Sequence, residues 1–430
     1  MMEKKKILIY GLGKTGISAN LFLKKRNEVY LYDDNKKYLK NRKITISKKN
    51  ISQYFFDYIL VSPGINIRKC ALKSFISKNL NKIITDLDVF YSHYFNNIII
   101  SITGTNGKST TTKILFEVLK DQKKDVRLVG NIGNPVLNEK NITPKTIFVI
   151  EASSYQIEYS KIFKANYAAI LNIYPDHLER HGNLDNYIGS KFKLIKNQNK
   201  GDNSFLDFKN KYLKKFLKRG NYKSKLFNIH SKLFSNKIKK IKNPYFLTSG
   251  NIENLRFVIA ITKKLGIKQS RLIKTINNFK GLNYRQQIIY KSKKLVVIND
   301  SKATSFSSTI NILKSLKSVR WLVGGIPKSG DTFFMTKKNC INFKAYIYGE
   351  NKNHFIKNLK NKIKYEVFND LKSALKKLIK DVNKEKIRMY NTILFSPSAA
   401  SFDSFKNFED RGKKFNFFID KLKFIKLISN

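Results

Sequence analysis

Cysteine and acidic residues are both scarce in this chain of 430 residues, which has two cysteines, and 30 Asp and Glu against 85 Lys and Arg. Cys70 and Cys340 lie far apart, with no metal-ligand spacing around them. This excludes a disulfide framework and a cysteine-based zinc site, and it suits a reducing compartment. The apolar share of 42% and the aromatic share of 13% argue against disorder and suffice for about two or three domains, each with its own core.

Long hydrophobic runs are also absent. The apolar stretch after the N-terminal lysines extends only from Ile7 to Tyr10, which is too short for the core of a signal peptide. Other runs, such as Ile98 to Ile100, have the length of a strand, whereas a membrane helix needs about 18 or more apolar residues. We therefore expect a soluble, cytoplasmic protein with no membrane insertion.

The excess of lysine gives a formal net charge of +55, which is typical of proteins with a nucleic-acid or membrane partner. A dedicated nucleic-acid surface would gather its charge on one face or in a tail. Here lysines accompany nearly every expected helix and loop, beside abundant Asn, Ile, Phe and Tyr, which an AT-rich genome over-supplies. We interpret the charge as compositional and expect no specific nucleic-acid partner.

Alternating strands and helices in three segments predict an α/β protein of three domains. Residues 1–95 should form a Rossmann-like domain, residues 96–281 a central P-loop ATPase-type domain with a parallel sheet, and residues 282–430 a second Rossmann-like domain. Strands are expected at residues 7–10, 29–32, 58–61, 98–102, 146–150, 168–171, 295–298, 321–323, 345–348 and 393–395. Helices are expected at residues 17–25, 109–120 and 371–380 and near the C-terminus. The lysine-rich segment 200–242 lacks a clear period.

The strongest motif extends from Gly104 to Thr110, between an expected buried strand and an expected helix. Its glycines let backbone N–H groups approach phosphate oxygens, and the helix directs its positive end to the same place. Lys108 can reach the β- and γ-phosphates, and Ser109 or Thr110 can bind Mg²⁺. The alternative is a glycine-rich turn with no ligand, since Ile102 occupies the position of the first glycine in the usual spacing. The order of strand, loop and helix favours a nucleotide site.

Polar residues follow the next two strands of the same segment, at Glu151 and at Asp176–His177. Ligands of an open parallel sheet bind beyond the carboxyl ends of its strands, so these side chains and Lys108 should converge at one edge. Oxygen and imidazole ligands beside a triphosphate suit Mg²⁺. Taken singly, Glu151 or His177 would be an ordinary strand-end residue; together with the loop, they favour a functional site.

The third segment also carries polar loops after its strands, at residues 299–304, 324–331 and 396–403. Lysines beside small hydroxyl residues suggest a pocket for an anionic small molecule such as a dicarboxylate. The alternative is that these are ordinary lysines of a lysine-rich chain, and spacing alone does not decide between the two.

The N-terminal turn, Gly11 to Gly16, is a complete GxGxxG between a strand and a helix, and Asp33 stands where a ribose-binding acid would lie. This pattern indicates a dinucleotide cofactor and hence a dehydrogenase. A hydride-transfer enzyme has no need of the Lys108 loop, however. A βαβ unit shaped for a diphosphate is equally consistent with a nucleotide-sugar substrate.

The motifs at residues 102–109, 130–133, 151–154 and 176–181 occur in the order seen in Mur ligases, and the chain resembles that family from end to end. The stretches 11–16, 299–304 and 396–412 resemble the branch that adds D-glutamate. The resemblance implies a monomeric cytoplasmic enzyme that uses ATP and Mg²⁺. It would join D-glutamate to UDP-N-acetylmuramoyl-L-alanine through an acyl phosphate, in peptidoglycan precursor synthesis.

The resemblance also implies a role for each matching residue. The catalytic residues would be Lys108, Glu151, His177 and Lys191. ATP would contact Gly104, Thr105, Asn106, Gly107, Lys108, Ser109, Thr110, Asn254, Arg285 and Asp300. The UDP-sugar would contact Thr15, Gly16, Asp33, Ser62, Pro63, Gly64, Asn131 and His177. D-glutamate would contact Lys302, Thr304, Lys328, Ser401 and Phe408. The metal ligands would be Ser109, Glu151, His177 and Lys191, the last if carbamylated.

Gly250, Asn283 and Tyr284 depart from the family pattern, which usually has His-Asn and Pro-His-Arg at these two places. Both departures lie around the adenine and ribose end of the expected ATP site. Another ligase of the family would differ in its acceptor pocket, and a folylpolyglutamate synthase-like enzyme would lack the N-terminal GxGxxG domain.

Overall fold

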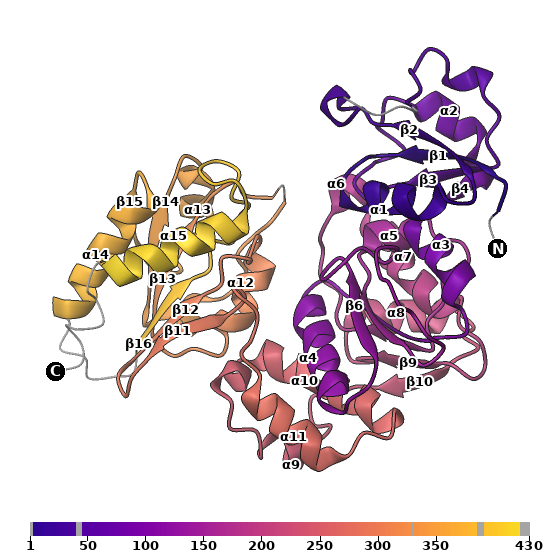
Figure 1. Ribbon diagram of the computed structural model, residues 1–430. Coiled ribbons are helices and arrows are strands. Elements are labelled where there is room, and N and C mark those ends of the chain that lie inside the picture. The colour runs from indigo at the N-terminus through magenta and orange to yellow at the C-terminus, as the bar shows by residue number, and fades with distance from the viewer. Residues whose placement is uncertain (1–2, 40–44, 329, 385–390, 422–430) are drawn as a thin grey trace. The chain divides into compact units, whose positions relative to one another are not determined.

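The structure is a computed structural model that describes residues 3–39, 45–328, 330–384 and 391–421. It contains three sheets, one in each of the three predicted segments (Figure 1). The chain divides into two compact units. The first comprises Met1–Lys240 and Asn254–Ile276 and holds the first two sheets; the second comprises Ile241–Glu253 and Asn277–Asn430 and holds the third. Within the described ranges, no helix combines the length and the apolarity that crossing a membrane requires.

The N-terminal sheet has four parallel strands in the order β2-β1-β3-β4. Its strands are β1 (Lys6–Tyr10), β2 (Glu28–Tyr32), β3 (Tyr58–Val61) and β4 (Ile83–Ile84). Its helices are α1 (Lys14–Leu23), α2 (Lys73–Lys78) and α3 (Asp86–Tyr94), with short 3₁₀ helices η1 (Lys36–Tyr38), η2 (Ile51–Gln53) and η3 (Leu80–Lys82). β1 is central and buried except for its first residue, as its continuous apolar run predicts.

The second sheet has six parallel strands in the order β10-β9-β8-β5-β7-β6. Its strands are β5 (Ile98–Thr103), β6 (Val126–Gly130), β7 (Ile147–Glu151), β8 (Tyr167–Ile170), β9 (Asn203–Leu206) and β10 (Lys225–Asn228). The helices of this segment are α4 (Lys108–Asp121), α5 (Ser154–Glu158), α6 (Leu178–His181), α7 (Leu184–Lys196), α8 (Lys211–Arg219), α9 (Ser235–Ile238), η4 (Pro244–Leu247), α10 (Ser249–Lys264) and α11 (Gln269–Asn278).

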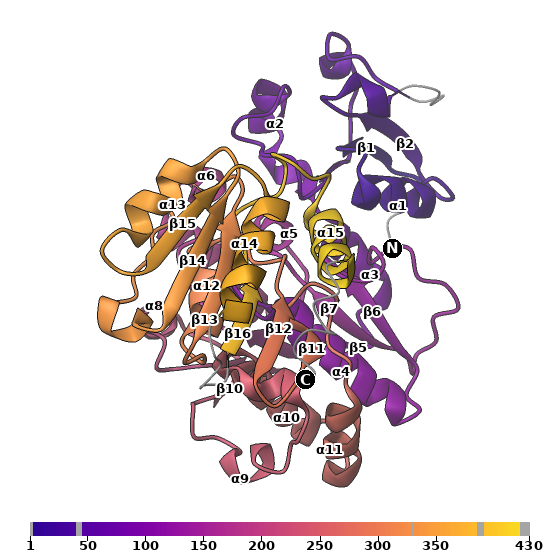
Figure 2. The same cartoon turned by 90° about the vertical axis from the view of Figure 1, so that its left-hand side faces the viewer.

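The third sheet also has six strands, in the order β11-β12-β16-β13-β14-β15, which Figure 2 shows side by side. β11 is antiparallel to β12, and the other neighbours are parallel. The strands are β11 (Gln287–Lys291), β12 (Leu295–Asn299), β13 (Val319–Gly324), β14 (Phe343–Tyr348), β15 (Lys364–Phe368) and β16 (Asn391–Phe395). The helices are α12 (Phe306–Leu313), η5 (Lys337–Cys340), α13 (Lys352–Leu359), α14 (Leu371–Lys384) and α15 (Phe408–Lys421).

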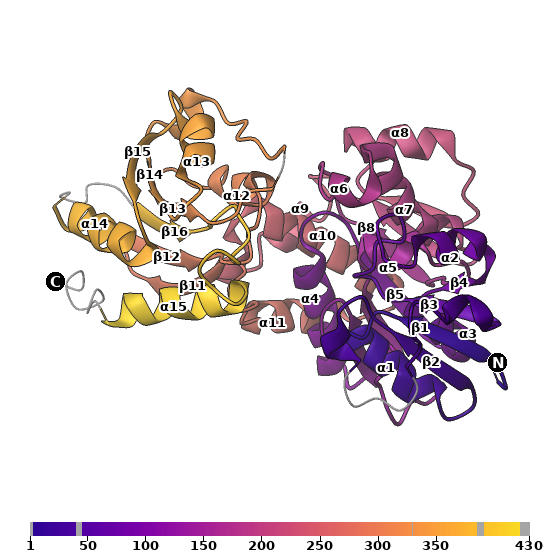
Figure 3. The same ribbon diagram turned by 90° about the horizontal axis from the view of Figure 1, so that it is seen from above.

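Helices cover both faces of this third sheet, as Figure 3 shows. One core joins α12 and α13 to one face, around Trp321 and Phe306. The other joins α14 and α15 to the opposite face, where Phe395 stacks on Phe415 with ring centroids 4.3 Å apart. This two-faced burial explains why its parallel strands have near-continuous apolar sequences.

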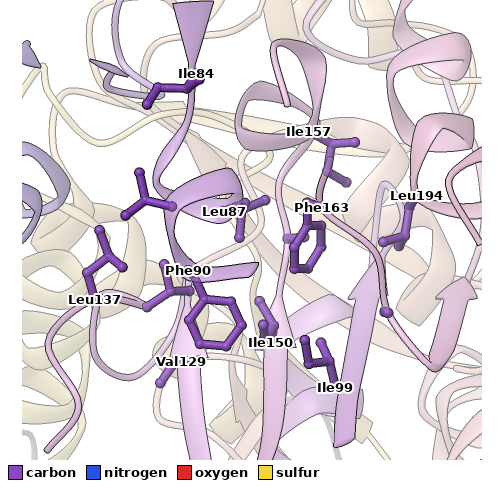
Figure 4. Close-up of a cluster of buried hydrophobic side chains, with 14 of the residues drawn as sticks. Ile84, Leu87, Phe90, Ile99, Val129, Leu137, Ile150, Ile157, Phe163 and Leu194 are labelled. Carbon is purple, nitrogen blue, oxygen red and sulfur yellow. The ribbon is translucent and has the colours of Figure 1, made fainter. Parts of the chain in front are cut away.

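Helix α3 packs the first two sheets into one unit. Figure 4 shows Leu87 and Phe90 of α3 among Ile99, Val129 and Ile150 of the second sheet. The carboxylate of Asp88, at the start of α3, accepts hydrogen bonds from the Ser160 hydroxyl (2.8 Å) and the Ile162 backbone N–H (2.9 Å). Apolar packing and a buried carboxylate thus fix the N-terminal sheet on the second one.

Candidate active site

The glycine-rich loop lies between β5 and α4, as the sequence predicts. Gly104 and Gly107 have φ values of +147° and +83°, in the range that favours glycine. A Cβ atom at Gly107 would lie 2.0 Å from Oδ1 of Asn254, a buried residue of α10. The loop therefore requires glycine at this position, and Asn254 lies directly against it.

The residues after β8 support the other side of the loop. Oδ1 of Asn172 accepts a hydrogen bond from the Asn106 backbone N–H (2.9 Å), and its backbone oxygen accepts one from Thr105 (2.9 Å). The Thr105 hydroxyl lies 2.9 Å from the Tyr187 hydroxyl. Sequence analysis assigned no role to Asn172 or Tyr187. The position of Asn172, close after the buried strand β8, is the sequence feature that could have indicated a role for it.

Two lysines share one carbonyl of the loop. Nζ of Lys108 donates to the Gly104 carbonyl (2.9 Å), and Nζ of Lys191, from α7, donates to the same oxygen (3.0 Å). Lys191 is 1% exposed. Burial, and then the nearby charge of Lys108, holds the pKa of Lys191 well below its ordinary value. The structure thus distinguishes Lys191 from its neighbours as a buried amine that favours the neutral, nucleophilic form.

Glu151 ends β7, where it pairs in register with Ile102 of β5 and Gly130 of β6. Its side chain is buried, and Oε1 accepts a hydrogen bond of 2.6 Å from Nδ2 of Asn131. Oε2 is also buried and has no hydrogen-bond partner among the residues that the structure describes. A buried carboxylate oxygen without a donor is costly unless a cation or ligand meets it, so this atom fits a divalent cation.

No three side chains of His, Cys, Asp or Glu gather into a metal-binding group in the part of the chain that the structure describes. The predicted Mg²⁺ site therefore consists of two such side chains, Glu151 and His177. Its other two ligands would be the hydroxyl of Ser109 and the carbamylated side chain of Lys191. Ser109 is buried in the first turn of α4.

His177 follows β8 and is the N-cap residue of α6, with a φ of +55°. Its Nδ1 lies 2.8 Å from the hydroxyl of Tyr155 on α5. Its Nε2 lies 3.5 Å from Oδ2 of Asp176, whose Oδ1 accepts the His177 backbone N–H at 3.0 Å. The strands β8, β5 and β7 are parallel neighbours. His177, Lys108 and Glu151 therefore lie at or beyond the carboxyl ends of adjacent strands, on the same edge of the sheet.

The N-terminal glycine turn is tightly packed. A Cβ atom at Gly16 would lie 1.9 Å from the Gly11 carbonyl, to which the Ser62 hydroxyl donates a hydrogen bond of 2.6 Å. Oδ2 of Asp33 accepts from the Leu12 backbone N–H (2.6 Å). The structure thus brings together the Thr15–Gly16 turn, Asp33 and the Ser62–Gly64 turn, and Asp33 braces the glycine turn itself.

The second unit contains the other predicted contacts. Asp300 follows β12, is buried, and accepts hydrogen bonds from the Ser396 hydroxyl (2.9 Å) and the Gln286 backbone N–H (3.1 Å). Arg285 precedes Gln286 in the turn before β11. Arg285 and Asp300 therefore belong to the second unit, whereas Asn254 and the glycine-rich loop belong to the first.

The predicted D-glutamate residues surround the loops after β12, β13 and β16. Nζ of Lys302 lies 4.0 Å from the centre of the Phe408 ring, a cation–π contact. Ser401 is buried, while Thr304 and Lys328 are partly exposed. The structure thus brings Lys302 and Phe408 into direct contact.

Arg411, in α15, ties these loops together and was missed by sequence reasoning. It is fully buried. Its guanidinium donates to the Ser301 carbonyl (2.7 Å) and to the Ala399 carbonyl (2.9 Å), and Nε donates to the Ser301 hydroxyl (3.1 Å). One planar cation therefore fixes the loop after β12 against the loop after β16.

Two of the departures from the family pattern, Tyr284 and Gly250, have different local surroundings. A Cβ atom at Gly412 would lie 2.4 Å from the ring of Tyr284, so this ring packs directly against a glycine of α15. Tyr284 has a φ of +60°. Gly250 lies in α10, and a Cβ atom there would meet its nearest neighbour, Cβ of Asn311, at 4.0 Å. The helix would therefore accept a side chain at Gly250.

A parallel sheet with a phosphate-type glycine loop after its central strand, beside a buried glutamate and lysine, defines a P-loop α/β protein. A model of the Mur ligase middle domain matches residues 102–265. The chain is 34% identical to a UDP-N-acetylmuramoylalanine–D-glutamate ligase of Rickettsia felis, covering 96% of each chain. It is 32% identical to the protein of that name from Francisella tularensis subsp. tularensis, over 97% of this chain and 96% of the relative.

Solved structures give the same fold. The UDP-N-acetylmuramate-alanine ligase MurC of Thermotoga maritima superposes with a TM-score of 0.55 at 18% identity, over 97% of this chain and 99% of that one. The MurF ligase of Thermotoga maritima in complex with ADP has a TM-score of 0.55 at 15% identity, over 86% and 97%. The chain belongs to the Mur ligase family, whose members are ATP-dependent ligases. The dehydrogenase alternative finds no support in these comparisons.

Proposed function

We propose that this protein is an ATP-dependent ligase that joins D-glutamate to UDP-N-acetylmuramoyl-L-alanine in the cytoplasmic synthesis of peptidoglycan precursors, acting as a monomer. The observation that carries the proposal is the sheet edge where Lys108 and the buried Lys191 share the Gly104 carbonyl. The names of the two relatives support the choice of acceptor and amino acid.

The reaction proceeds in two steps. An oxygen of the alanyl carboxylate attacks the γ-phosphorus of ATP, ADP leaves, and an acyl phosphate forms. The amine of D-glutamate then attacks the acyl carbon; the new C–N bond forms, phosphate leaves, and the amine loses a proton. Both steps bring anions together, so cationic groups held in place before reaction lower the barrier. Lys108 serves the β- and γ-phosphates, and the glycine-rich loop holds them through its backbone N–H groups.

Ser109, Glu151, His177 and carbamylated Lys191 hold Mg²⁺, which offsets the charge of the phosphates. The buried Oε2 of Glu151 supports this assignment. In the proposed carbamylation, the deprotonated amine of Lys191 attacks CO₂, an N–C bond forms, and one proton is released. The product is a carboxylate where the chain now carries an amine, close to the charge of Lys108.

Each predicted domain has one ligand in this proposal. Residues 1–95 bind the uridine diphosphate through the turns at Thr15–Gly16 and Ser62–Gly64 and through Asp33, with Asn131 and His177 contributing from the central domain. Residues 96–281 bind ATP through the glycine-rich loop and Asn254. Residues 282–430 bind D-glutamate. The D-glutamate contacts are Lys302, Thr304, Lys328, Ser401 and Phe408, and the further ATP contacts are Arg285 and Asp300.

The test is phosphate release from ATP in the presence of Mg²⁺ and UDP-N-acetylmuramoyl-L-alanine, with D-glutamate compared with L-glutamate, L-lysine and meso-diaminopimelate. We expect release with D-glutamate alone, and a loss of about 10²- to 10³-fold in the Lys108→Ala variant. Release with a different amino acid would support the ligase reaction but would refute D-glutamate as the amino-acid substrate. Absence of release with every amino acid, from folded protein, would refute the proposed reaction.

A further inference from the structure

The hydroxyl of Tyr155 lies 2.8 Å from Nδ1 of His177. Tyr155 belongs to α5, whose start is fixed by a capping box in which Ser153 and Gln156 exchange hydrogen bonds. The two rings meet nearly edge to face, with centroids 4.9 Å apart and planes at 61°. The hydroxyl therefore comes from a rigid element and reaches one particular nitrogen of the imidazole.

The backbone of His177 adopts a conformation that a non-glycine residue rarely takes, with a φ of +55°. Such strain costs roughly 1–3 kcal/mol and persists where the surroundings hold the residue from several sides. Oδ1 of Asp176 accepts the backbone N–H, Oδ2 of Asp176 lies 3.5 Å from Nε2, and the Tyr155 hydroxyl lies 2.8 Å from Nδ1. A carboxylate oxygen of Glu179 lies 3.7 Å from the same Nδ1, but its side chain is 70% exposed, so Tyr155 is the stronger partner.

An imidazole can rotate by half a turn and can carry its proton on either nitrogen. A hydrogen bond at Nδ1 fixes the rotation of the ring, and a hydroxyl that accepts from Nδ1–H there leaves the lone pair on Nε2. Outer partners of metal-binding histidines act in this way, and losing one typically costs about 10- to 100-fold in metal affinity or activity.

We propose that Tyr155 is a positioning residue whose hydroxyl accepts from Nδ1–H of His177, so that the ring orientation is fixed and Nε2 keeps its lone pair for a cation. This inference rests on the proposed function, in which His177 is a ligand. The positioning of His177 depends on the Tyr155 hydroxyl, so it can be tested separately from the packing of the Tyr155 ring. The Tyr155 ring also lies 4.9 Å from the Arg180 guanidinium and 5.6 Å from the ring of His181, and phenylalanine retains both contacts.

Tyr155→Phe is therefore the test variant, and Tyr159→Phe is its matched control. Tyr159 is the C-cap residue that follows α5, and its ring lies 5.5 Å from the same Arg180 guanidinium. Its hydroxyl is buried beside Glu158. The control thus removes a nearby hydroxyl that does not touch His177.

The first measurement is ¹⁵N NMR of the imidazoles in the full chain, without metal or substrate, near neutral pH. The chain has five histidines, so the spectrum is simple, and a His177→Gln variant identifies the His177 signals. We expect Nδ1 and Nε2 shifts of a single tautomer in the parent protein and in Tyr159→Phe. In Tyr155→Phe they should move toward the average of two exchanging tautomers, while the other histidines stay unchanged. Unchanged His177 shifts in folded Tyr155→Phe would overturn the proposal.

The second measurement is Mn²⁺ binding, with Mn²⁺ alone as the probe, together with phosphate release under the conditions above. We expect Tyr155→Phe to bind Mn²⁺ about 10-fold more weakly and to lose kcat by a similar factor, with an unchanged KM for D-glutamate. Altered imidazole shifts with unaltered Mn²⁺ affinity would also overturn the proposal. Failure of the parent protein to release phosphate would instead refute the proposed reaction, while the NMR result would still decide whether Tyr155 positions His177.

Discussion

Nδ2 of Asn131 donates a hydrogen bond of 2.6 Å to Oε1 of Glu151 and thereby holds the carboxylate at the end of β7 in one orientation. The bond uses one oxygen of Glu151 and leaves Oε2 as the atom that fits a cation. Asn131, expected at the nucleotide-sugar site, therefore also orients the proposed metal ligand. The loop after β6 is thus coupled to the chemistry at the end of β7.

We predict that Asn131→Ala weakens Mn²⁺ binding by roughly 10-fold, because Glu151 loses the donor that orients it. The variant also leaves Oε1 of the buried Glu151 without this donor, so the free energy of unfolding should fall by about 1–3 kcal/mol. Calorimetric titration with Mn²⁺ in the absence of nucleotide-sugar separates this effect from substrate contacts.

Asn134→Ala is the matched control for this variant. Asn134 is exposed, like Asn131, and donates to the carboxylate of Glu139 at 2.8 Å. Its variant should bind Mn²⁺ like the parent protein. Equal Mn²⁺ affinity in Asn131→Ala and Asn134→Ala would refute the orienting role.

Lys191→Ala should lose most of the ligase activity, because the proposed carbamate disappears with the amine. Short carboxylates such as acetate should restore part of it, since the substitution leaves space beside Gly104 in which a carboxylate can take the place of the proposed carbamate. The activity assay is phosphate release with and without added acetate. Carbon NMR of protein equilibrated with labelled CO₂ should show a carbamate signal in the parent and none in the variant.

The control is Lys196→Ala, which removes an exposed lysine from the same helix. It should leave activity and the carbamate signal unchanged. Full activity of Lys191→Ala without any added carboxylate would exclude the proposed role of Lys191.

Arg411→Met should destabilise the second unit by about 3 kcal/mol or more, because the Ser301 and Ala399 carbonyls lose their buried donor. The single tryptophan of the chain, Trp321, lies in the core of the third sheet. Its fluorescence during urea unfolding therefore reports on the unfolding of the second unit. Lys413→Met changes an exposed residue of the same helix and should unfold like the parent. An unfolding midpoint of Arg411→Met equal to that of Lys413→Met would contradict this prediction.

Hydrophobic pattern predicted the strands well, because parallel strands buried on both faces have continuous apolar sequences. The predicted strand 58–61 coincides with β3, and 7–10 lacks only the first residue of β1. The predicted helix 17–25 begins earlier in the structure, at Lys14, directly after the glycine turn, and ends at Leu23. The prediction for 371–380 was too short, since α14 continues to Lys384.

No elements were predicted in the lysine-rich segment 200–242, although the apolar residues of α8 recur with a helical period. It forms β9, α8, β10 and α9, and α8 buries Leu213 while Lys214, Lys215 and Lys218 stay exposed. The partners of the site also escaped prediction. Tyr155, Asn172 and Arg411 act through hydrogen bonds to residues far from them in sequence, and no local pattern marks such bonds.

Asp300 should make the second unit less stable as the pH rises from about 4 to about 7. Burial raises the pKa of Asp300 to about 7, whereas an unfolded aspartate has a pKa of about 3.9. Between these values the folded protein retains a proton that the unfolded chain has lost. The free energy of unfolding therefore falls with rising pH, by up to about 1.4 kcal/mol per pH unit from this group, and levels off above about 7.

Asp300→Asn removes this ionisation and retains both an acceptor for the Gln286 N–H and a group that can bond to Ser396. Urea unfolding followed by Trp321 fluorescence should give a parent-minus-variant difference that is constant below about pH 4. The difference should then fall as the pH rises, so that the variant gains relative stability up to about pH 7. Asp86, whose pKa burial raises to about 6, lies in the first unit and is unchanged in the variant, so it cancels from the difference. A difference that does not vary between pH 4 and 7 would mean that Asp300 ionises as readily in the folded protein as in the unfolded chain.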